Sequence, residues 1–236
     1  MNKAPIAVAL DAPDLGVLRA WSRAVSPVVT TLKVGLEVFC RDGAEAVHAA
    51  RLGASEVGSA DVQIFLDLKL HDIPATVGGA ARAVADLEPA FLTVHASGGA
   101  AMIEAAVLAL PQTRITAVTV LTSMDEDALA SIGMAGPAID AAVRLALVAV
   151  SAGARAIVCS PLEVAAIRAV VPADITLITP GVRPAGADVN DQKRVATPQE
   201  AIAAGADLLV IGRPITAAPD LTEAAWAIAN SLGAGA

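Results

Sequence analysis

The stretch FLDLKLHDIPATV, residues 65–77, joins a strand pattern to the start of a helix. Leucines at every second position give one apolar face, and the opposite face carries Asp67, Lys69 and His71. Alternation of this kind predicts a β-strand, because successive side chains of a strand point to opposite sides. Pro74 follows closely, and proline is favoured at the first position of a helix. The stretch therefore predicts a strand that runs into a helix, with charged side chains near the junction.

The same unit of strand and helix recurs along the chain. Runs rich in β-branched and aliphatic residues alternate with Ala-rich segments of helical period. The expected strands are IAVAL (6–10), VVTTLKV (28–34), VQIFLDLKL (62–70), FLTVH (91–95), ITAVTVL (115–121), ARAIVCS (154–160), ITLITPG (175–181) and ADLLVIG (206–212). The expected helices are 14–24, 36–51, 74–86, 98–110, 138–152, 162–171, 198–204 and 221–232. Eight alternations over about 250 residues are typical of an α/β fold, the (β/α)8 TIM barrel.

The composition suits one barrel domain over residues 1–236. The chain is 56% hydrophobic but only 2% aromatic, so its core must be packed from small and branched aliphatic side chains. Such a core fits parallel strands buried under Ala-rich helices. A doubly wound open sheet is the alternative, yet it often carries a glycine fingerprint after the first strand, and IAVAL lacks one.

Charge and cysteine content narrow the expected partners. A formal net charge of -8 repels phosphate backbones and anionic membranes, so we expect no nucleic-acid partner. No apolar stretch has the about 20 residues of a membrane span, and MNKAPIAVALD does not resemble a signal peptide. Cys40 and Cys159 lack the spacing of a metal or redox motif, and we expect both to be reduced and buried. These features predict a cytoplasmic protein with no metal or cofactor.

Charged residues point inward on the first three predicted strands. The alternation places Asp11, Lys33, Asp67 and Lys69 on the inner faces. Sites in barrels form at the carboxyl ends of the strands, so these four side chains should meet at one rim. A structural salt-bridge network is the alternative, although an apolar core would replace it at lower cost.

Asp72 breaks this alternation and falls just beyond the third strand. We expect it to leave the rim on a loop, toward a neighbouring subunit. Because Asp is a good N-cap residue and Pro74 follows, a helix cap is the competing interpretation. The two roles do not exclude each other.

The last two strands end in residues that suit an anion. Arg183 follows the seventh strand, and Gly212 and Arg213 follow the eighth. Barrels hold phosphate here, on backbone amides at a short helix start backed by arginine. Arg213 is therefore predicted to bind phosphate, a surface arginine being the alternative. The polar segment 183–194 has the character of a mobile lid from which Gln192 reaches the phosphate, or else of an idle surface loop.

The remaining polar residues at strand ends do not by themselves indicate a particular ligand or reaction. Thr122 and Ser123 follow the fifth strand in VLTSM. His95 points inward on the fourth strand and His71 lies at the rim. For both histidines a satisfied hydrogen bond is favoured over a catalytic role.

These motifs together resemble the orotidine 5′-phosphate decarboxylase family. DLKLHDIPATV matches its Asp-x-Lys-x-x-Asp signature, and LKVGLEVF, TVHASGG, VTVLTSM, TPGVRP and VIGRP extend the match to nearly the whole chain. Related sugar-phosphate decarboxylases and synthases share the signature. The further matches at Thr122, Arg183, Gln192 and Arg213 make the resemblance specific.

The resemblance implies a lyase of pyrimidine biosynthesis that converts orotidine 5′-phosphate to uridine 5′-phosphate and CO2 without a cofactor. It implies that Lys69 is the proton donor, that Asp67 lies beside the departing carboxylate, and that Lys33 and Asp72 complete the catalytic group. It also implies a homodimer with shared sites. The implied substrate contacts are Asp11 and Lys33 on the ribose, Thr122 and Ser123 on the pyrimidine, Arg183, Gln192, Gly212 and Arg213 at the phosphate, and Asp72 and Thr76 from the partner, with Ile73 between them.

Two other functions remain open. A metal-dependent sugar-phosphate decarboxylase or synthase on the same scaffold would need Mg²⁺ held by extra carboxylates on the second and third strands. Glu37 is the only near candidate on the second strand. A non-catalytic nucleotide-binding barrel would bind uridine 5′-phosphate but leave orotidine 5′-phosphate unchanged.

Overall fold

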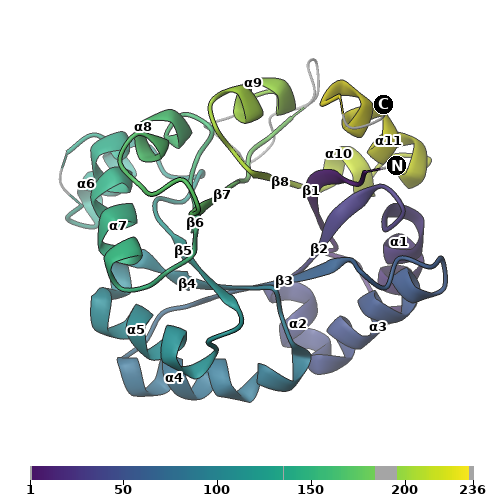
Figure 1. Ribbon diagram of the computed structural model, residues 1–236, viewed down its shortest axis with the longest axis horizontal. Helices are drawn as coiled ribbons and strands as arrows, with labels where there is room; N and C mark the ends of the chain where they lie inside the picture. Colours follow the sequence, from purple (N-terminus) through teal and green to yellow (C-terminus); the bar gives the residue numbers. More distant parts are fainter. Residues whose placement is uncertain (1, 135, 184–195, 234–236) are drawn as a thin grey trace.

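Eight parallel strands form a closed barrel at the centre of the molecule, surrounded by helices (Figure 1). The structure is a computed structural model that describes residues 2–134, 136–183 and 196–233. The strands are β1 (Ala4–Ala9), β2 (Val29–Gly35), β3 (Gln63–Leu70), β4 (Phe91–His95), β5 (Arg114–Val118), β6 (Ala156–Val158), β7 (Thr176–Thr179) and β8 (Leu208–Ile211). They pair in chain order, and β8 pairs with β1. The predicted (β/α)8 TIM barrel is confirmed.

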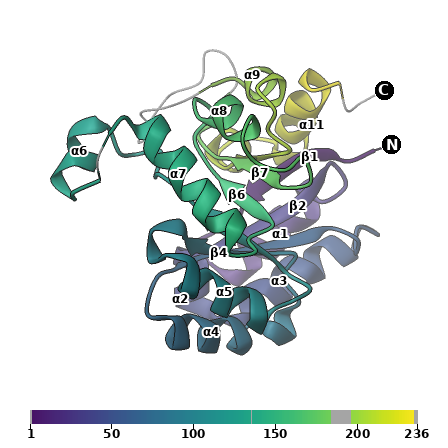
Figure 2. The ribbon, with the colours of Figure 1, turned by 60° about the vertical axis from the view of Figure 1, so that its left-hand side comes forward.

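Helices cover the outer face of the barrel. They are α1 (Leu15–Val25), α2 (Leu36–Asp42), α3 (Ala44–Ser55), α4 (Pro74–Ala83), α5 (Ala100–Ala109), α6 (Glu126–Ser131), α7 (Ala138–Ser151), α8 (Val164–Arg168), α9 (Pro198–Ala203), α10 (Arg213–Thr216) and α11 (Leu221–Ser231), with 3-10 turns η1 (Ala85–Leu87) and η2 (Ala96–Gly98). Figure 2 shows α6 projecting beyond α7, away from the barrel. In the described part of the chain, no helix combines the length and apolar character needed to cross a bilayer.

The helices differ from the expected pattern in three places. The segment 36–51 forms two helices, because Gly43 has a φ of 60°, a conformation that favours glycine and interrupts the helix. The short helices α6 and α10 were not expected, since so few residues show no clear period.

The two cysteines differ in burial. Cys159 is buried as predicted, but the prediction for Cys40 is wrong, because its side chain is exposed. Cys40 lies two residues from the buried Val38 and hence off the packed face of α2.

Two apolar layers stabilise the barrel. The larger one lies between strands and helices and contains the outward leucines of the strands, such as the fully buried Leu66 and Leu92. The smaller one consists of Ala7, Phe65, Phe91, Ala156, Ile178 and Leu208. These positions have the opposite parity, so they fill the barrel interior. Burial of one phenylalanine side chain contributes about 1.5–3 kcal/mol.

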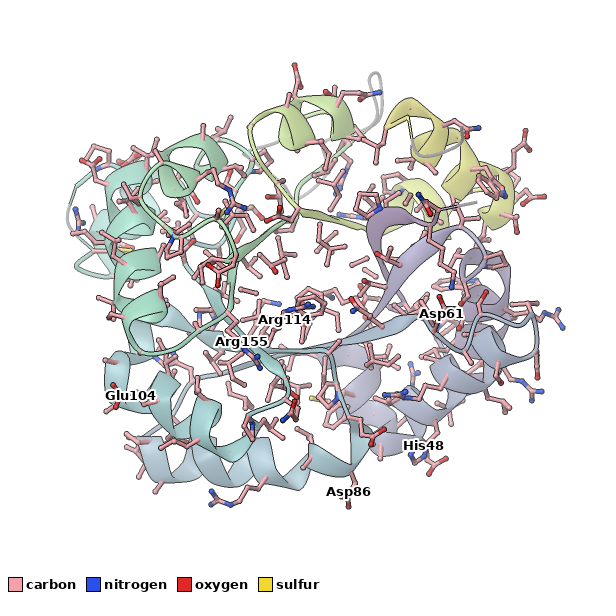
Figure 3. All side chains as sticks on the ribbon, in the orientation of Figure 1. His48, Asp61, Asp86, Glu104, Arg114 and Arg155 are labelled. Atoms are coloured by element: carbon pink, nitrogen blue, oxygen red, sulfur yellow. The ribbon has the colours of Figure 1, made fainter. Side chains whose placement is uncertain are left out.

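The amino-terminal end of the barrel is closed by side chains. The guanidinium carbon of Arg114, the first residue of β5, lies 5.1 Å from the ring centroid of Phe91. Figure 3 shows Arg114 in the middle of the barrel, whereas His48 and Asp86 lie on its outer side. The ring centroids of Phe91 and Phe65 are 5.5 Å apart, so the packing continues from Arg114 into the barrel interior. A ligand therefore enters the barrel from the carboxyl end of the strands.

The strand β3 bulges at its carboxyl end. Between its last two paired positions, the register advances by four residues on β3 (66 to 70) and by two on β4 (92 to 94), so residues 67–69 face Thr93 alone. Lys69 has a φ of 48°, which is uncommon for a residue other than glycine. The regular alternation therefore ends at Asp67, and a bulge re-aims the residues beyond it.

Candidate active site

A cavity of about 290 Å³ opens at the carboxyl ends of the strands. Its lining includes Lys33, Asp67 and Lys69 from β2 and β3, and Thr122 and Ser123 from the segment after β5. Apolar side chains such as those of Val118, Val120, Val158 and Pro180 form the rest of its wall. This first cavity thus combines an apolar wall with a cluster of charges, which is typical of a site for a small polar ligand.

Asp67 lies at the centre of the charge cluster. Its side chain is buried, and both of its carboxylate oxygens lie 2.8 Å from the Nζ of Lys69. The Nζ of Lys33 lies 3.0 Å from Oδ2. Burial raises the pKa of Asp67, but the charges and hydrogen bonds of the two lysines outweigh it and lower the pKa to about 2. Asp67 is therefore an anion at neutral pH.

Lys33 lies between two carboxylates. Burial lowers the pKa of Lys33, but the nearby charges of Asp67 and Asp11 raise it further, so the net shift is upward. Gly35 makes this approach possible: an ideal Cβ at this position would lie 2.9 Å from Oδ1 of Asp11 and 3.0 Å from Nζ of Lys33. Lys33 is therefore a fixed cation that links the first two strands to the third.

Lys69 is the more accessible of the two ammonium groups that contact Asp67. Its side chain is 30% exposed, against 12% for Lys33. Its backbone N–H donates a hydrogen bond of 2.7 Å to the hydroxyl of Thr93, which in turn donates one of 3.0 Å to Oδ1 of Asp67. Among the residues at this site, Lys69 thus offers a positive charge to a bound ligand.

A second cavity of about 470 Å³ adjoins the first. The two are continuous, because Pro180 and Val210 line both. The polar lining of the second cavity includes Asp11, Arg183, Gly212, Arg213 and Thr216. Two arginines beside exposed backbone suit an anionic group, since guanidinium binds phosphate in a bidentate way. The combined space therefore fits a ligand with an anionic end and a second polar group some distance away.

Residues Asp72, Ile73 and Thr76 lie on an exposed loop and the first turn of α4. Ile73 is 65% exposed, which is unusual for so large an apolar side chain. The carboxylate of Asp72 accepts a hydrogen bond of 2.6 Å from the backbone N–H of Ile73. Ile73 is the N-cap residue and has no side-chain cap bond. The interpretation of Asp72 as a helix cap is therefore wrong, because Pro74 starts the helix one residue too late for it.

Two histidines adjoin the cluster. The ring centroids of His71 and His95 are 5.3 Å apart. Burial lowers the pKa of His95, and the charges of His71 and Lys69 lower it further against an opposing effect of Asp67. His95 is therefore a neutral ring beside the site at pH 7.

The structure brings most of the predicted site residues together. Lys33, Asp67, Lys69, Thr122 and Ser123 line the first cavity, and Asp11, Arg183, Gly212 and Arg213 line the second. Gln192 and all but the first residue of the expected lid 183–194 lie outside the described residues. Thr93 was not predicted, although it shares the inward parity of His95.

The carboxylate named for a metal-dependent alternative is in neither cavity lining. Glu37 is exposed in the first turn of α2. Within residues 2–134, 136–183 and 196–233, no group of three or more His, Cys, Asp or Glu side chains is arranged to hold a metal ion.

Comparison with known proteins agrees with the fold and shows the family. Residues 4–228 match the model of the Orotidine 5′-phosphate decarboxylase / HUMPS family. An orotidine 5′-phosphate decarboxylase of Thermobifida fusca is 65% identical over 229 residues, which cover 97% of this chain and 96% of that protein. One of Frankia casuarinae is 54% identical over 245 residues, covering 99% and 89%. The crystal structure of orotidine 5′-phosphate decarboxylase from Lactobacillus acidophilus is 34% identical, with a TM-score of 0.79 and coverage of 98% and 99%. The chain belongs to the orotidine 5′-phosphate decarboxylase / HUMPS family.

Proposed function

We propose that this barrel is a catalytic domain that decarboxylates orotidine 5′-phosphate to uridine 5′-phosphate and CO2, a step of pyrimidine biosynthesis. The observation that carries the proposal is the buried Asp67 carboxylate held between the ammonium groups of Lys33 and Lys69 in the first cavity. Family membership and relatives named for this activity support it.

The charge cluster suits the difficult step of this reaction. Loss of CO2 from C6 leaves a carbanion with no adjacent carbonyl to delocalise it, so the site must stabilise the charge directly. We assign this role to the accessible ammonium group of Lys69, which then delivers its proton to C6. Lys33, Asp67, Lys69 and the neighbouring Asp11 carry no net formal charge, so the attraction for an anionic substrate comes from Arg183 and Arg213 of the second cavity.

Asp67 adds a local repulsion to this favourable field. Two like charges about 4 Å apart repel by roughly 4 kcal/mol at an effective dielectric of 20. A substrate carboxylate beside Asp67 is therefore strained in the bound state, and its departure as CO2 relieves the strain. The flanking lysines reduce this repulsion, because both contact the Asp67 carboxylate.

The remaining contacts follow the two cavities. We assign Asp11 and Lys33 to the ribose, and Thr122 and Ser123 to the pyrimidine. Arg183, Gln192, Gly212 and Arg213 are assigned to the phosphate. Binding energy from the distant phosphate raises turnover when it is used to assemble the site.

We further propose a homodimer in which each subunit completes the site of the other. The exposed side chains of Asp72 and Thr76, together with the 65% exposed Ile73, support a subunit contact at the start of α4. In the dimer, Asp72 approaches the ammonium group of Lys69 of the partner subunit and helps to orient it.

The decisive experiment follows the absorbance of orotidine 5′-phosphate with EDTA present, for the wild-type chain and for Lys69→Ala. We expect wild-type turnover to survive the chelator and the variant to bind uridine 5′-phosphate without turnover. Loss of activity in EDTA favours the metal-dependent alternative. Binding without any absorbance change in the wild type favours the non-catalytic alternative, and normal turnover by Lys69→Ala rejects the mechanism.

A further inference from the structure

Thr93 lies on β4 directly opposite the bulge in β3. Its side chain is fully buried, and its hydroxyl makes two hydrogen bonds to β3. It accepts one of 2.7 Å from the backbone N–H of Lys69 and donates one of 3.0 Å to Oδ1 of Asp67. A single hydroxyl thus joins the two residues on which the proposed chemistry depends.

The hydrogen bond with Lys69 satisfies the backbone N–H of that residue, which the bulge removes from the regular pairing of β3 with β4. Residues 67–69 face one residue of β4, and Lys69 has a φ of 48°. A buried backbone N–H without an acceptor is costly, so nearly all of them have a partner. The hydroxyl of Thr93 supplies that acceptor. It thereby favours the backbone conformation that sets the direction of the Lys69 side chain.

The bond to Asp67 follows from the first one. A hydroxyl has one proton, and an ionised carboxylate only accepts hydrogen bonds. Because the Thr93 oxygen accepts from Lys69, its proton is available to Oδ1 of Asp67. That oxygen also contacts Nζ of Lys69, and the other one contacts Lys33 and Lys69. The carboxylate is therefore held at both oxygens, and rotation of its plane breaks charge-assisted bonds.

We infer that Thr93 is a positioning residue that orients the Asp67 carboxylate relative to Lys69. The inference rests on the proposed function, since the arrangement that it maintains is the one assigned to catalysis. Thr93 is 0% exposed, so it acts through Asp67 and Lys69 rather than on the substrate. Its removal should reduce turnover more than substrate binding, because the phosphate contacts lie in the second cavity.

The test compares kcat and KM of the wild type with those of Thr93→Val and Thr93→Ser. Loss of the hydroxyl should lower kcat about 10- to 100-fold, as expected for a buried polar group deprived of its partner. The KM should change less than about threefold, because uniform binding is retained. Thr93→Ser keeps the hydroxyl and should retain kcat within about fivefold of the wild type.

Thr116→Val is the matched control. Thr116 is also fully buried, pairs in register with Thr93, and donates its hydroxyl to the carbonyl of Arg114 at 2.9 Å. We expect its kcat to stay within about twofold of the wild type. The inference is wrong if Thr93→Val is as active as the wild type, if Thr93→Ser is as impaired as Thr93→Val, or if the control is equally impaired.

Two further measurements keep the test decisive. If Thr93→Val does not fold, the Ser and Ala variants at position 93 isolate the same hydroxyl, and equal activity of the two overturns the inference. A crystal structure of Thr93→Val or Thr93→Ala, whichever folds, needs no turnover. We expect a rotated Asp67 carboxylate, and unchanged contacts to Lys69 overturn the inference. A wild type that leaves orotidine 5′-phosphate unchanged rejects the proposed function. The crystal structure of the variant tests the positioning role of Thr93 separately.

Discussion

The Nζ atom of Lys69 lies 2.8 Å from both carboxylate oxygens of Asp67. A buried carboxylate is costly unless it is paired and hydrogen-bonded, and the contact with Lys33 at 3.0 Å completes the pairing. Lys69 nevertheless keeps a 30% exposed side chain. The pair therefore combines a fixed anion with a cation that a substrate can reach.

Replacement of Lys69 by Ala is expected to lower kcat at least about 1,000-fold, because both the stabilising charge and the proton donor are lost. Uridine 5′-phosphate should still bind, since its phosphate contacts are intact. The measurement is the initial rate of absorbance change together with calorimetric binding. Lys3→Ala is the control, because Lys3 pairs with the exposed Asp61 on the surface. An equal loss in both variants would contradict the assignment.

Replacement of Arg213 by Ala is expected to lower kcat/KM about 100- to 1,000-fold, because a charge-assisted contact to phosphate is lost. Arg213 lines the second cavity, which is continuous with the first. Steady-state kinetics over a range of substrate concentrations measure the effect. Arg23→Ala, in the last turn of α1, serves as the control and should behave as the wild type. A wild-type kcat/KM for Arg213→Ala would remove this residue from the phosphate site.

A mixture of two inactive variants tests the shared site. In a dimer of Lys69→Ala with Asp72→Ala, one of the two sites receives an intact Lys69 and an intact Asp72. Random exchange of subunits should therefore restore about a quarter of the wild-type activity. The control mixes Lys69→Ala with the double variant, which contains no intact site. Absence of recovery, once mass spectrometry has verified the exchange, would show that Asp72 acts within its own chain or not at all.

The charge cluster predicts a loss of stability in acid. The pKa of Asp67 is lowered from 3.8 to about 2, so its contribution is present above pH 3.8 and is lost as the pH falls through 2. The shift corresponds to about 2 kcal/mol of unfolding free energy. Urea unfolding of the wild type and Asp67→Asn between pH 7 and pH 2 measures it. The variant should be less stable at pH 7 and should show a shallower acid slope, whereas Asp86→Asn, which removes an exposed carboxylate outside the cluster, should keep the wild-type slope.

The sequence predicts the barrel and the charge cluster because both depend on local alternation. The inward parity of Asp67 holds up to the point where β3 bulges. The bulge itself has no signal in FLDLKLH, since neither glycine nor proline marks it. The role of Thr93 was missed for a related reason: it arises from the register between two strands, which one strand alone does not reveal.

Two other differences between the expected and the observed helices could have been predicted from the sequence. Gly43 follows Asp42 at the point where α2 ends, and glycine is a common helix terminator, so the division of segment 36–51 was predictable. Pro74 at the first helical position makes Ile73 the N-cap residue, which excludes Asp72 from that role. The subunit contact of Asp72 is a property of two chains and stays a prediction.

The close approach of Asp11 and Lys33 to Gly35 restricts which residues can replace this glycine. Because any Cβ there would meet Asp11 and Lys33, a substitution would push apart the groups assigned to the ribose before it disturbed the hydrophobic layers. Substitution at position 35 should therefore separate folding stability from ribose binding. We expect such a variant to remain folded but to bind the sugar less tightly. Engineering of this barrel toward other nucleotides has to begin from an unsubstituted backbone at that point.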